Sequence, residues 1–225
     1  MTLVISFYTC REGSRELKMI RQPSDFQKYI YHFTTAKTAL NRILPERRLK
    51  FSKFNRLNDP KENLSFGFWS ILDTMDPEAD PDLFREIKKQ IRKRIRILCF
   101  TEDYRERYGS RIIVESGFKH PRMWDRYASG DRGICLVFHK QMLIGQLREQ
   151  LGDENLLAGR IYYTPKLKFP RFSVEDYRKD AKRFVNEYIR KNARELFFMK
   201  HFDWRTEHEF RILFRGPQKE AGYGN

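Results

Sequence analysis

The sequence has few cysteines, and none lies in a pattern that would give it a structural role. Its 225 residues include three, Cys10, Cys99 and Cys135, with no C-x-x-C pair and no Cys/His cluster. An odd number without such spacing argues against a disulfide scaffold and against a structural zinc site. We therefore expect a reducing, cytoplasmic compartment.

Long apolar runs and glycine-rich phosphate loops are also missing. The opening MTLVISFYTC is too short an apolar run for a signal peptide and lacks a basic start, and no stretch approaches the roughly 20 apolar residues of a membrane span. Neither G-x-G-x-x-G after a strand nor G-x-x-x-x-G-K-[ST] occurs, so the usual cradles for nucleotide phosphates are absent. These absences predict a soluble protein with no membrane partner.

Positive charge is what the chain has in excess. Its 45 Lys and Arg outnumber its 30 Asp and Glu, which gives a net charge of +15. Basic side chains release counterions from a phosphate backbone, so nucleic acid, either RNA or DNA, is the expected partner. The 40% hydrophobic content is enough for one sizeable core. We expect one catalytic domain over residues 25–215, between an N-terminal arm (1–24) and a flexible tail (216–225).

Hydrophobic patterning predicts an α+β fold. Runs rich in β-branched and aromatic residues predict strands at 28–33, 48–52, 95–100, 132–138, 160–164 and 207–214. Helices are expected over about 36–44 with Thr34 or Thr35 as the N-cap, from Asp59–Pro60, and through the long stretch that begins at Ser173. Because the βαβ rhythm is missing, we expect a split, bent, mainly antiparallel sheet with flanking helices.

The segment DPDLFREIKKQIRKRIRILCF predicts a helix with an apolar face and a basic face. The basic face is a candidate nucleic-acid surface, although a solvated helix face accounts for the same pattern. Its members are Lys88, Lys89, Arg92, Lys93, Arg94 and Arg96.

Three polar clusters, YHFTT, MWDRYASGDRGICLVF and WRTEHEFRI, lie at expected strands or at their approaches. In the last cluster, alternation along a strand predicts that Glu207, Glu209 and Arg211 share one face while His208 and Phe210 share the other. A solvated strand face with an arginine salt bridge is the ordinary explanation of this pattern. Ordinary explanations for the other two clusters are a hydrogen-bonded core histidine and aromatic packing along one helix face.

Taken together, the clusters resemble known families. YHFTTAKTALNRILPERRLKFS resembles the opening motif of bacterial ADP-ribosyltransferase toxins that modify nucleic acid, and the order His, aromatic, Glu is similar to their His-Tyr-Glu layout. FNRLNDPKE, CFTED, MWDRYASGDRGICLVF and W-x-x-E-x-E-F-R-I also resemble a bacterial domain of unknown function found in abortive-infection and phage-defence settings. The resemblance implies an ADP-ribosyltransferase-like fold, NAD as the cofactor, and a toxin or defence effector that a separate antitoxin protein neutralises.

The resemblance also implies a role for each glutamate of the last cluster. Glu209 would stabilise the positive charge that develops on the ribose when the nicotinamide bond breaks, as a carboxylate does in glycoside hydrolysis. Glu207 would orient or deprotonate the acceptor.

The remaining implied contacts belong to NAD itself. His32 and Thr34 would hold its ribose, and Tyr127 or Trp124 would pack on its nicotinamide ring. Arg211 would meet the pyrophosphate or pair with the glutamates. No metal ligand is implied.

Two other functions remain open from the residues alone. A metal-dependent nuclease would gather acids around Mg²⁺ and bind its substrate through the basic surface. Its candidate ligands are Asp59, Glu62, Glu102, Glu207 and Glu209. A non-catalytic nucleic-acid-binding module would instead stack bases on some of the 19 Phe and 11 Tyr side chains.

Overall fold

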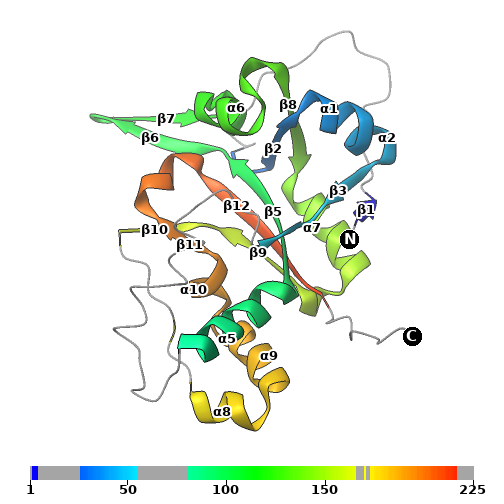
Figure 1. Ribbon diagram of the computed structural model, residues 1–225. Coiled ribbons are helices and arrows are strands. Elements are labelled where there is room, and N and C mark those ends of the chain that lie inside the picture. The colour runs from blue at the N-terminus through cyan, green and yellow to red at the C-terminus, as the bar shows by residue number, and fades with distance from the viewer. Residues whose placement is uncertain (1, 5–25, 55–80, 166–169, 171–172, 217–225) are drawn as a thin grey trace. The chain divides into compact units, whose positions relative to one another are not determined.

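The computed structural model of the chain describes residues 2–4, 26–54, 81–165, 170 and 173–216 (Figure 1). The chain divides into two compact units, and each is described by itself. Unit 1 comprises residues 1–51, 99–158 and 207–210. Unit 2 comprises residues 52–98, 159–206 and 211–225. The segment FNRLNDPKE beyond Phe54, with the helix start expected at Asp59–Pro60, lies outside the described residues.

The sheet of unit 1 is built on β2 (Tyr29–Thr35), which pairs antiparallel with β8 (Gly133–His139) on one side and with β5 (Ile95–Glu102) on the other. The strand order is β8-β2-β5-β12-β9, and β12 (Glu209–Arg215) and β9 (Leu156–Arg160) continue beyond the unit. β-Branched and aromatic side chains fill β2, β5 and β8, which suits a pleated surface packed on both sides.

The first helical segment of unit 1 begins at a threonine that caps it. The Thr35 side chain accepts a hydrogen bond from the backbone N–H of Thr38, which confirms Thr35 as the N-cap of the first helical segment. That segment runs through α1 (Ala36–Thr38), a π-helical turn (Ala39–Ile43) and α2 (Leu44–Glu46). The next strand, β3 (Arg48–Lys50), pairs with β1 (Thr2–Val4). Two further α-helices of the unit are α6 (Pro121–Tyr127) and α7 (Lys140–Leu151).

A two-stranded ribbon follows β5 in the same unit. Its strands are β6 (Tyr104–Tyr108) and β7 (Arg111–Glu115), which pair antiparallel across a turn at Gly109 and Ser110. The positive φ of Gly109, +60°, is a left-handed turn conformation that glycine adopts without steric cost. The sequence patterning gave no strand here, so this ribbon is an addition to the expected fold.

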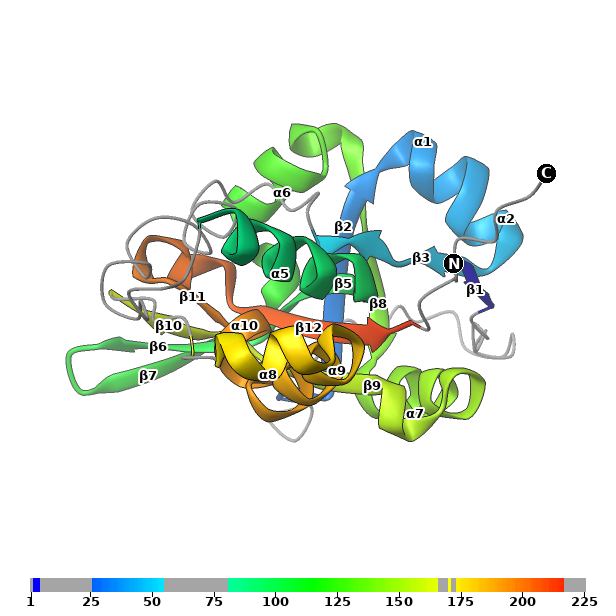
Figure 2. The ribbon, with the colours of Figure 1, turned by 60° about the horizontal axis from the view of Figure 1, so that its bottom comes forward.

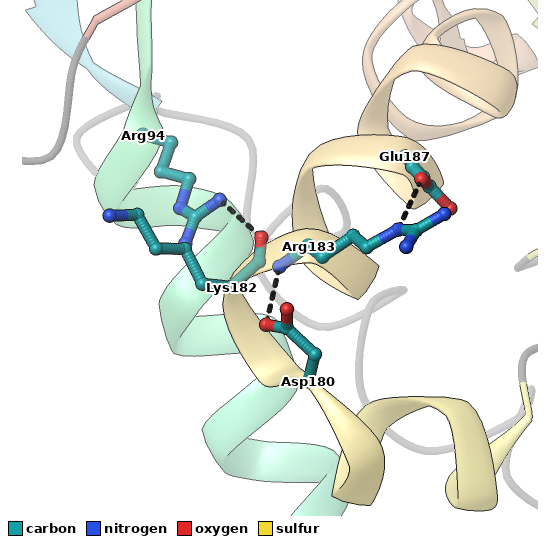
Figure 3. Close-up of polar contacts among 5 residues, drawn as sticks. All are labelled: Arg94, Asp180, Lys182, Arg183 and Glu187. Atoms are coloured by element: carbon teal, nitrogen blue, oxygen red, sulfur yellow. Dashed lines mark hydrogen bonds and ion pairs between the residues drawn. The ribbon is translucent and has the colours of Figure 1, made fainter.

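In unit 2, α5 (Pro81–Arg94) packs against α9 (Ala181–Lys191), and the long helix expected from Ser173 is divided into segments (Figure 2). Ser173 caps the first segment, and Asp180, in an extended conformation, ends it and caps the next through the backbone N–H of Arg183 (Figure 3). The other elements are β4 (Ser52–Lys53), β10 (Tyr162–Thr164), α8 (Val174–Lys179), α10 (Ala193–Phe197) and β11 (Met199–His201).

The prediction of mixed helices and strands in mainly antiparallel sheets is confirmed, with β10 and β11 as a short parallel pair. The expected strands at 28–33, 95–100 and 132–138 are observed within two residues of their predicted ends. None of the helices that the structure describes is long and apolar enough to cross a membrane.

Candidate functional site

The two faces of the unit 1 sheet carry different chemistry. On one face, Tyr31 and Phe33 of β2 form a buried cluster with Met123 and Ala128, and Trp124 packs against it. We call this the α6 face. Side chains alternate along a strand, so Ile30, His32 and Thr34 lie on the opposite face, which we call the α7 face.

Side-chain contacts extend both faces across the neighbouring strands. The ring of His32 lies 5.6 Å from that of Phe100, so Phe100 and, two residues on, Glu102 belong to the α7 face. The Lys140 ammonium contacts both the Glu102 carboxylate, at 2.8 Å, and the Phe210 ring. Phe210 therefore also lies on the α7 face, and Glu209, the preceding residue of β12, lies on the α6 face.

Helix α6 is fixed by close contacts at both of its ends. Pro121 occupies its first turn, where the missing N–H costs nothing, and the Trp124 indole N–H donates to the Phe118 carbonyl at 2.6 Å. At the other end, a side chain on Gly133 would clash with the Ala128 carbonyl, so only glycine allows β8 to approach the helix this closely. These contacts hold the last turn of α6 over the sheet.

Glu207 does not lie on the strand where alternation predicts it. It ends a 3-10 helix (Phe202–Glu207), and β12 begins only at Glu209. Between them His208 adopts the left-handed conformation, with φ of +44°. The prediction that Glu207, Glu209 and Arg211 share a strand face is thus wrong for Glu207, because the chain turns at His208. The ordinary explanation of the pattern, a solvated strand face, is also wrong, because β12 is buried at every position from Glu209 to Phe214.

The turn brings Glu207 under the last turn of α6. The Tyr127 hydroxyl donates to Glu207 Oε1 at 3.0 Å, and Arg126 Nη1 lies 3.6 Å from the same oxygen. The Glu207 side chain is 3% exposed, whereas that of Arg126 is 35% exposed and forms the solvent side of the cluster. We refer to Arg126, Tyr127, Glu207 and Glu209 as the carboxylate site.

A buried hydroxyl group lies next to Glu209 on the same face. The Glu102 backbone N–H donates to the His208 carbonyl, which sets the register of β5 and β12 and places Thr101 opposite Glu209. Thr101 is also opposite Tyr31 on β2. Its hydroxyl is fully buried, and Oγ1 has no hydrogen-bond partner within the described part of the chain. A buried polar atom without a partner is costly and calls for an explanation, such as a ligand group.

The residues expected to hold NAD divide between the two faces. Tyr127 and Trp124 lie on the α6 face with the carboxylate site. His32 and Thr34 lie on the α7 face, where His32 Nδ1 meets the Cys99 carbonyl at 3.1 Å and burial lowers the pKa of the imidazole. The structure does not bring these two residues together with the glutamates.

Arg211 has a structural contact rather than an exposed position. Its side chain is fully buried, and Nη1 donates to the Phe197 carbonyl at 2.8 Å. Trp124 likewise shows the packing that its helical position suggests, with its ring 5.3 Å from that of Phe33 in an edge-to-face arrangement.

The acids proposed for a nuclease do not converge in the described residues. Glu102 lies on the α7 face, paired with Lys140, while Glu209 lies on the α6 face. Asp59 and Glu62 are outside the described residues. Within the ranges that the structure describes, no three His, Cys, Asp or Glu side chains gather closely enough to hold a metal ion.

The basic helix face expected for nucleic acid is only partly exposed. Arg94 is 6% exposed, and its Nη1 donates to Asn186 Oδ1 and to the Lys182 carbonyl on α9 (Figure 3). Its burial, with Arg215 nearby, lowers the pKa of the guanidinium. The prediction that Arg94 belongs to an exposed nucleic-acid surface is therefore wrong, because its side chain is buried where α5 packs against α9. Lys89 and Lys93 are exposed, and Lys89 pairs with Glu86.

Sequence reasoning missed Arg126, the solvent side of the carboxylate site. It adjoins Tyr127 in the MWDRY segment, yet residue spacing gives no reason to prefer it over the other 44 basic residues. The left-handed turn at His208, which joins Arg126 to Glu207 in space, has no sequence signal because the residue is not glycine.

A family model described as a protein of unknown function, DUF2971, matches residues 123–212 of the chain. The matched segment begins in α6 and ends in β12, so it includes Arg126, Tyr127, Glu207 and Glu209, but not His32 or Thr34. No curated protein and no solved structure matches the chain.

Proposed function

We propose that this chain is an NAD-consuming ADP-ribosyltransferase whose reaction centre is the carboxylate site, and that its acceptor is nucleic acid. The observation that carries the proposal is the pair of buried glutamates on either side of a left-handed, non-glycine residue. Such a residue costs on the order of 1–3 kcal/mol and persists where the surrounding structure requires it, often at functional sites. Here it supports a site built around Glu207 and Glu209.

The chemistry of the site suits an NAD ribose. Carboxylates accept hydrogen bonds from ribose hydroxyls, and the Thr101 hydroxyl is a further polar group whose hydrogen-bonding capacity is unused within the described residues. The half-exposed ring of Tyr127 offers a surface on which the nicotinamide ring can pack. In this proposal His32 holds β2 to β5 through the Cys99 carbonyl and does not contact NAD.

The proposed reaction breaks the bond between the ribose C1′ and the nicotinamide nitrogen. Nicotinamide leaves as a neutral molecule with the bonding electron pair, and positive charge develops on the ribose, where the Glu209 carboxylate stabilises it. An acceptor oxygen or nitrogen then bonds to C1′ and gives its proton to Glu207. Arg126 and Tyr127 position Glu207 for this step.

The setting proposed for the activity is a toxin or phage-defence effector, with a separate antitoxin as a second partner. Nucleic acid as the acceptor is supported by the net charge of +15. The resemblance of the MWDRYASGDRGICLVF and W-x-x-E-x-E-F-R-I segments to a defence-associated domain supports the setting.

The test is incubation of the full chain with NAD labelled in its adenosine part, in the presence of DNA, RNA or cell protein. We expect nicotinamide release and label in the nucleic-acid fraction. Glu209→Gln keeps the size of the side chain but removes its charge, so nicotinamide release should fall about 10²-fold or more. Glu207→Gln should suppress labelling while leaving NAD hydrolysis, because water still captures the ribose.

A matched control is Glu149→Gln, an exposed glutamate on α7, which should behave as the wild type. Circular dichroism and thermal melting establish that each variant is folded. Unchanged activity in both folded site variants, or a strict need for Mg²⁺ with no use of NAD, would remove the transferase and favour the nuclease.

A further inference from the structure

The β6–β7 ribbon combines basic and aliphatic side chains in a regular arrangement. Cross-strand partners share a face, and the register pairs Arg105 with Val114 and Arg107 with Ile112. One face of the ribbon therefore carries two arginines beside two aliphatic side chains. Both views show the end of the ribbon reaching past α6 and the sheet strands of its unit (Figures 1 and 2).

These side chains face solvent. The exposed fractions are 61% for Ile112 and 51% for Val114, and Ile113, on the opposite face of the ribbon, is 40% exposed. Arg107 and, on the opposite face of the ribbon, Arg111 are exposed and make no hydrogen bond or ion pair within the part of the chain that the structure describes. Adjacent exposed aliphatic residues rimmed by charge mark an interaction surface more often than a solvated one.

The base of the ribbon is held firmly at the carboxylate site. The Tyr104 ring stacks on that of His208, with centroids 4.0 Å apart and planes 2° from parallel. His208 is the left-handed residue between the two glutamates. On the other face, the Arg105 guanidinium lies over the Phe26 ring at 4.4 Å. The base of the ribbon therefore lies against the residue that separates Glu207 from Glu209.

We propose that the β6–β7 ribbon inserts into the major groove of duplex DNA and presents this acceptor to the carboxylate site. The B-DNA major groove, about 12 Å wide, admits a two-stranded ribbon whose strands are roughly 4.8 Å apart. Arginines reach phosphates or guanine edges, and aliphatic side chains contact thymine methyl groups. The major groove of A-form RNA is too deep and narrow for such contacts. The inference rests on the proposed function only for the role of the DNA as acceptor.

Charge favours DNA over a second copy of the chain as the occupant. Ribbon-to-ribbon pairing through the face that carries Ile112 and Val114 would bring Arg105 and Arg107 of one copy close to those of the other. Like charges facing each other across strands are destabilising. A polyanion instead complements these arginines and the charge of the whole chain.

The experiment measures binding to a fluorescent DNA duplex of about 20 base pairs by anisotropy, without NAD, over a range of salt concentrations. Arg107→Glu with Arg111→Glu should weaken binding at least about tenfold and reduce the salt-dependence slope by about 2, one unit for each lost phosphate contact. The matched control reverses Arg178 and Arg190, two exposed arginines of α8 and α9, and should change affinity far less.

A second variant separates the aliphatic contribution from charge. Ile112→Ser with Val114→Ser should lower affinity several-fold while leaving the salt slope unchanged, because no ionic contact is lost. Both residues are exposed, so folding should be retained. Duplex RNA and single-stranded DNA of the same sequence should bind more weakly than duplex DNA to the wild type.

Equal binding of wild type and ribbon variants would overturn the proposal, as would equally tight binding of duplex RNA or single strands. Light scattering tests the other occupant: a dimer that the ribbon variants convert to monomer, with DNA binding unchanged, would assign the surface to a second copy. Glu209→Gln should bind DNA as the wild type does. A wild type that binds DNA but consumes no NAD would therefore reject the reaction and leave the ribbon assignment standing.

Discussion

The two faces of the unit 1 sheet each hold a buried glutamate beside a cation, yet the two pairs differ in access. On the α7 face, Lys140 Nζ lies 2.8 Å from Glu102 Oε1, with side chains 14% and 4% exposed. On the α6 face, Arg126 lies 3.6 Å from Glu207 and is 35% exposed. The first pair is tight and closed, whereas the second is looser, opens to solvent and includes the Tyr127 hydroxyl.

We interpret the first pair as a structural ion pair and the second as part of the proposed site. In a short buried pair, the Coulomb attraction offsets part of the desolvation cost. Both side chains are then held by each other and are closed to a ligand. In the second pair the arginine is half-exposed, so an anionic or hydroxyl-bearing molecule can reach it from solvent. Buried charge alone does not identify a functional carboxylate; buried charge with a solvent-connected partner is the better indicator.

The largest effect that tests this comparison is expected for Lys140→Met. Removing the ammonium leaves a buried charge at Glu102, so the free energy of unfolding should fall by about 3–5 kcal/mol. Urea denaturation measures it. In the folded fraction, nicotinamide release should stay at the wild-type level, because Lys140 lies on the face away from the carboxylate site.

Lys119→Met is the matched control for the lysine substitution. Lys119 pairs with Glu115 at 3.9 Å with side chains 60% and 31% exposed, and such a pair contributes about 0–1 kcal/mol. Adding Glu102→Gln to Lys140→Met should restore part of the lost stability. Equal destabilisation by the two lysine substitutions would contradict the contrast between a closed pair and an exposed one.

A smaller effect on stability and a larger one on function are expected for Tyr127→Phe. The variant keeps the ring but loses the hydroxyl that donates to Glu207, which should lower the free energy of unfolding by about 1–2 kcal/mol. Acceptor labelling should fall more than nicotinamide release, because Glu207 rather than Glu209 loses its orienting contact.

Tyr162→Phe provides the control, since its side chain is 56% exposed on β10. Its unfolding free energy should stay within about 0.5 kcal/mol of the wild type. Parallel loss of release and labelling in Tyr127→Phe would show that the hydroxyl serves the site as a whole and not Glu207 alone.

The strands were predictable because β-branched and aromatic residues cluster in YIYHFTT, IRILCFTE and GICLVFH, and such clusters suit only a pleated, buried surface. The β6–β7 ribbon escaped because its two sides are both exposed, so no alternation of apolar and polar residues marks it. The Gly109–Ser110 pair was the available signal for a two-residue hairpin turn.

The candidate site was predictable only in part, for a geometric reason. The sequence predicts Glu207, Glu209 and Tyr127 as site residues, because each lies in one of the polar clusters. Which of them meet depends on the left-handed conformation of His208 and on the face of the sheet that α6 covers. Adjacent residues of a strand point to opposite faces of the sheet, so His32 lies on the α7 face, apart from the glutamates.

The smallest effect concerns the pH dependence of stability on the α7 face. Burial lowers the pKa of His32 below its usual 6.5, with the Cys99 carbonyl partly offsetting the shift. The unfolded chain therefore binds a proton more readily than the folded chain, so stability is full above about pH 6.5 and is lost as the pH falls below it. The slope from this group is at most about 1.4 kcal/mol per pH unit.

His32→Gln keeps a hydrogen-bonding side chain but cannot titrate, so urea denaturation between pH 5 and pH 7 should show a flatter dependence. The same variant should consume NAD at the wild-type rate at pH 7.5, because His32 does not face the carboxylate site. An unchanged slope would show that the imidazole is protonated as easily in the folded protein as in the unfolded chain, and a loss of NAD consumption would return His32 to the reaction centre.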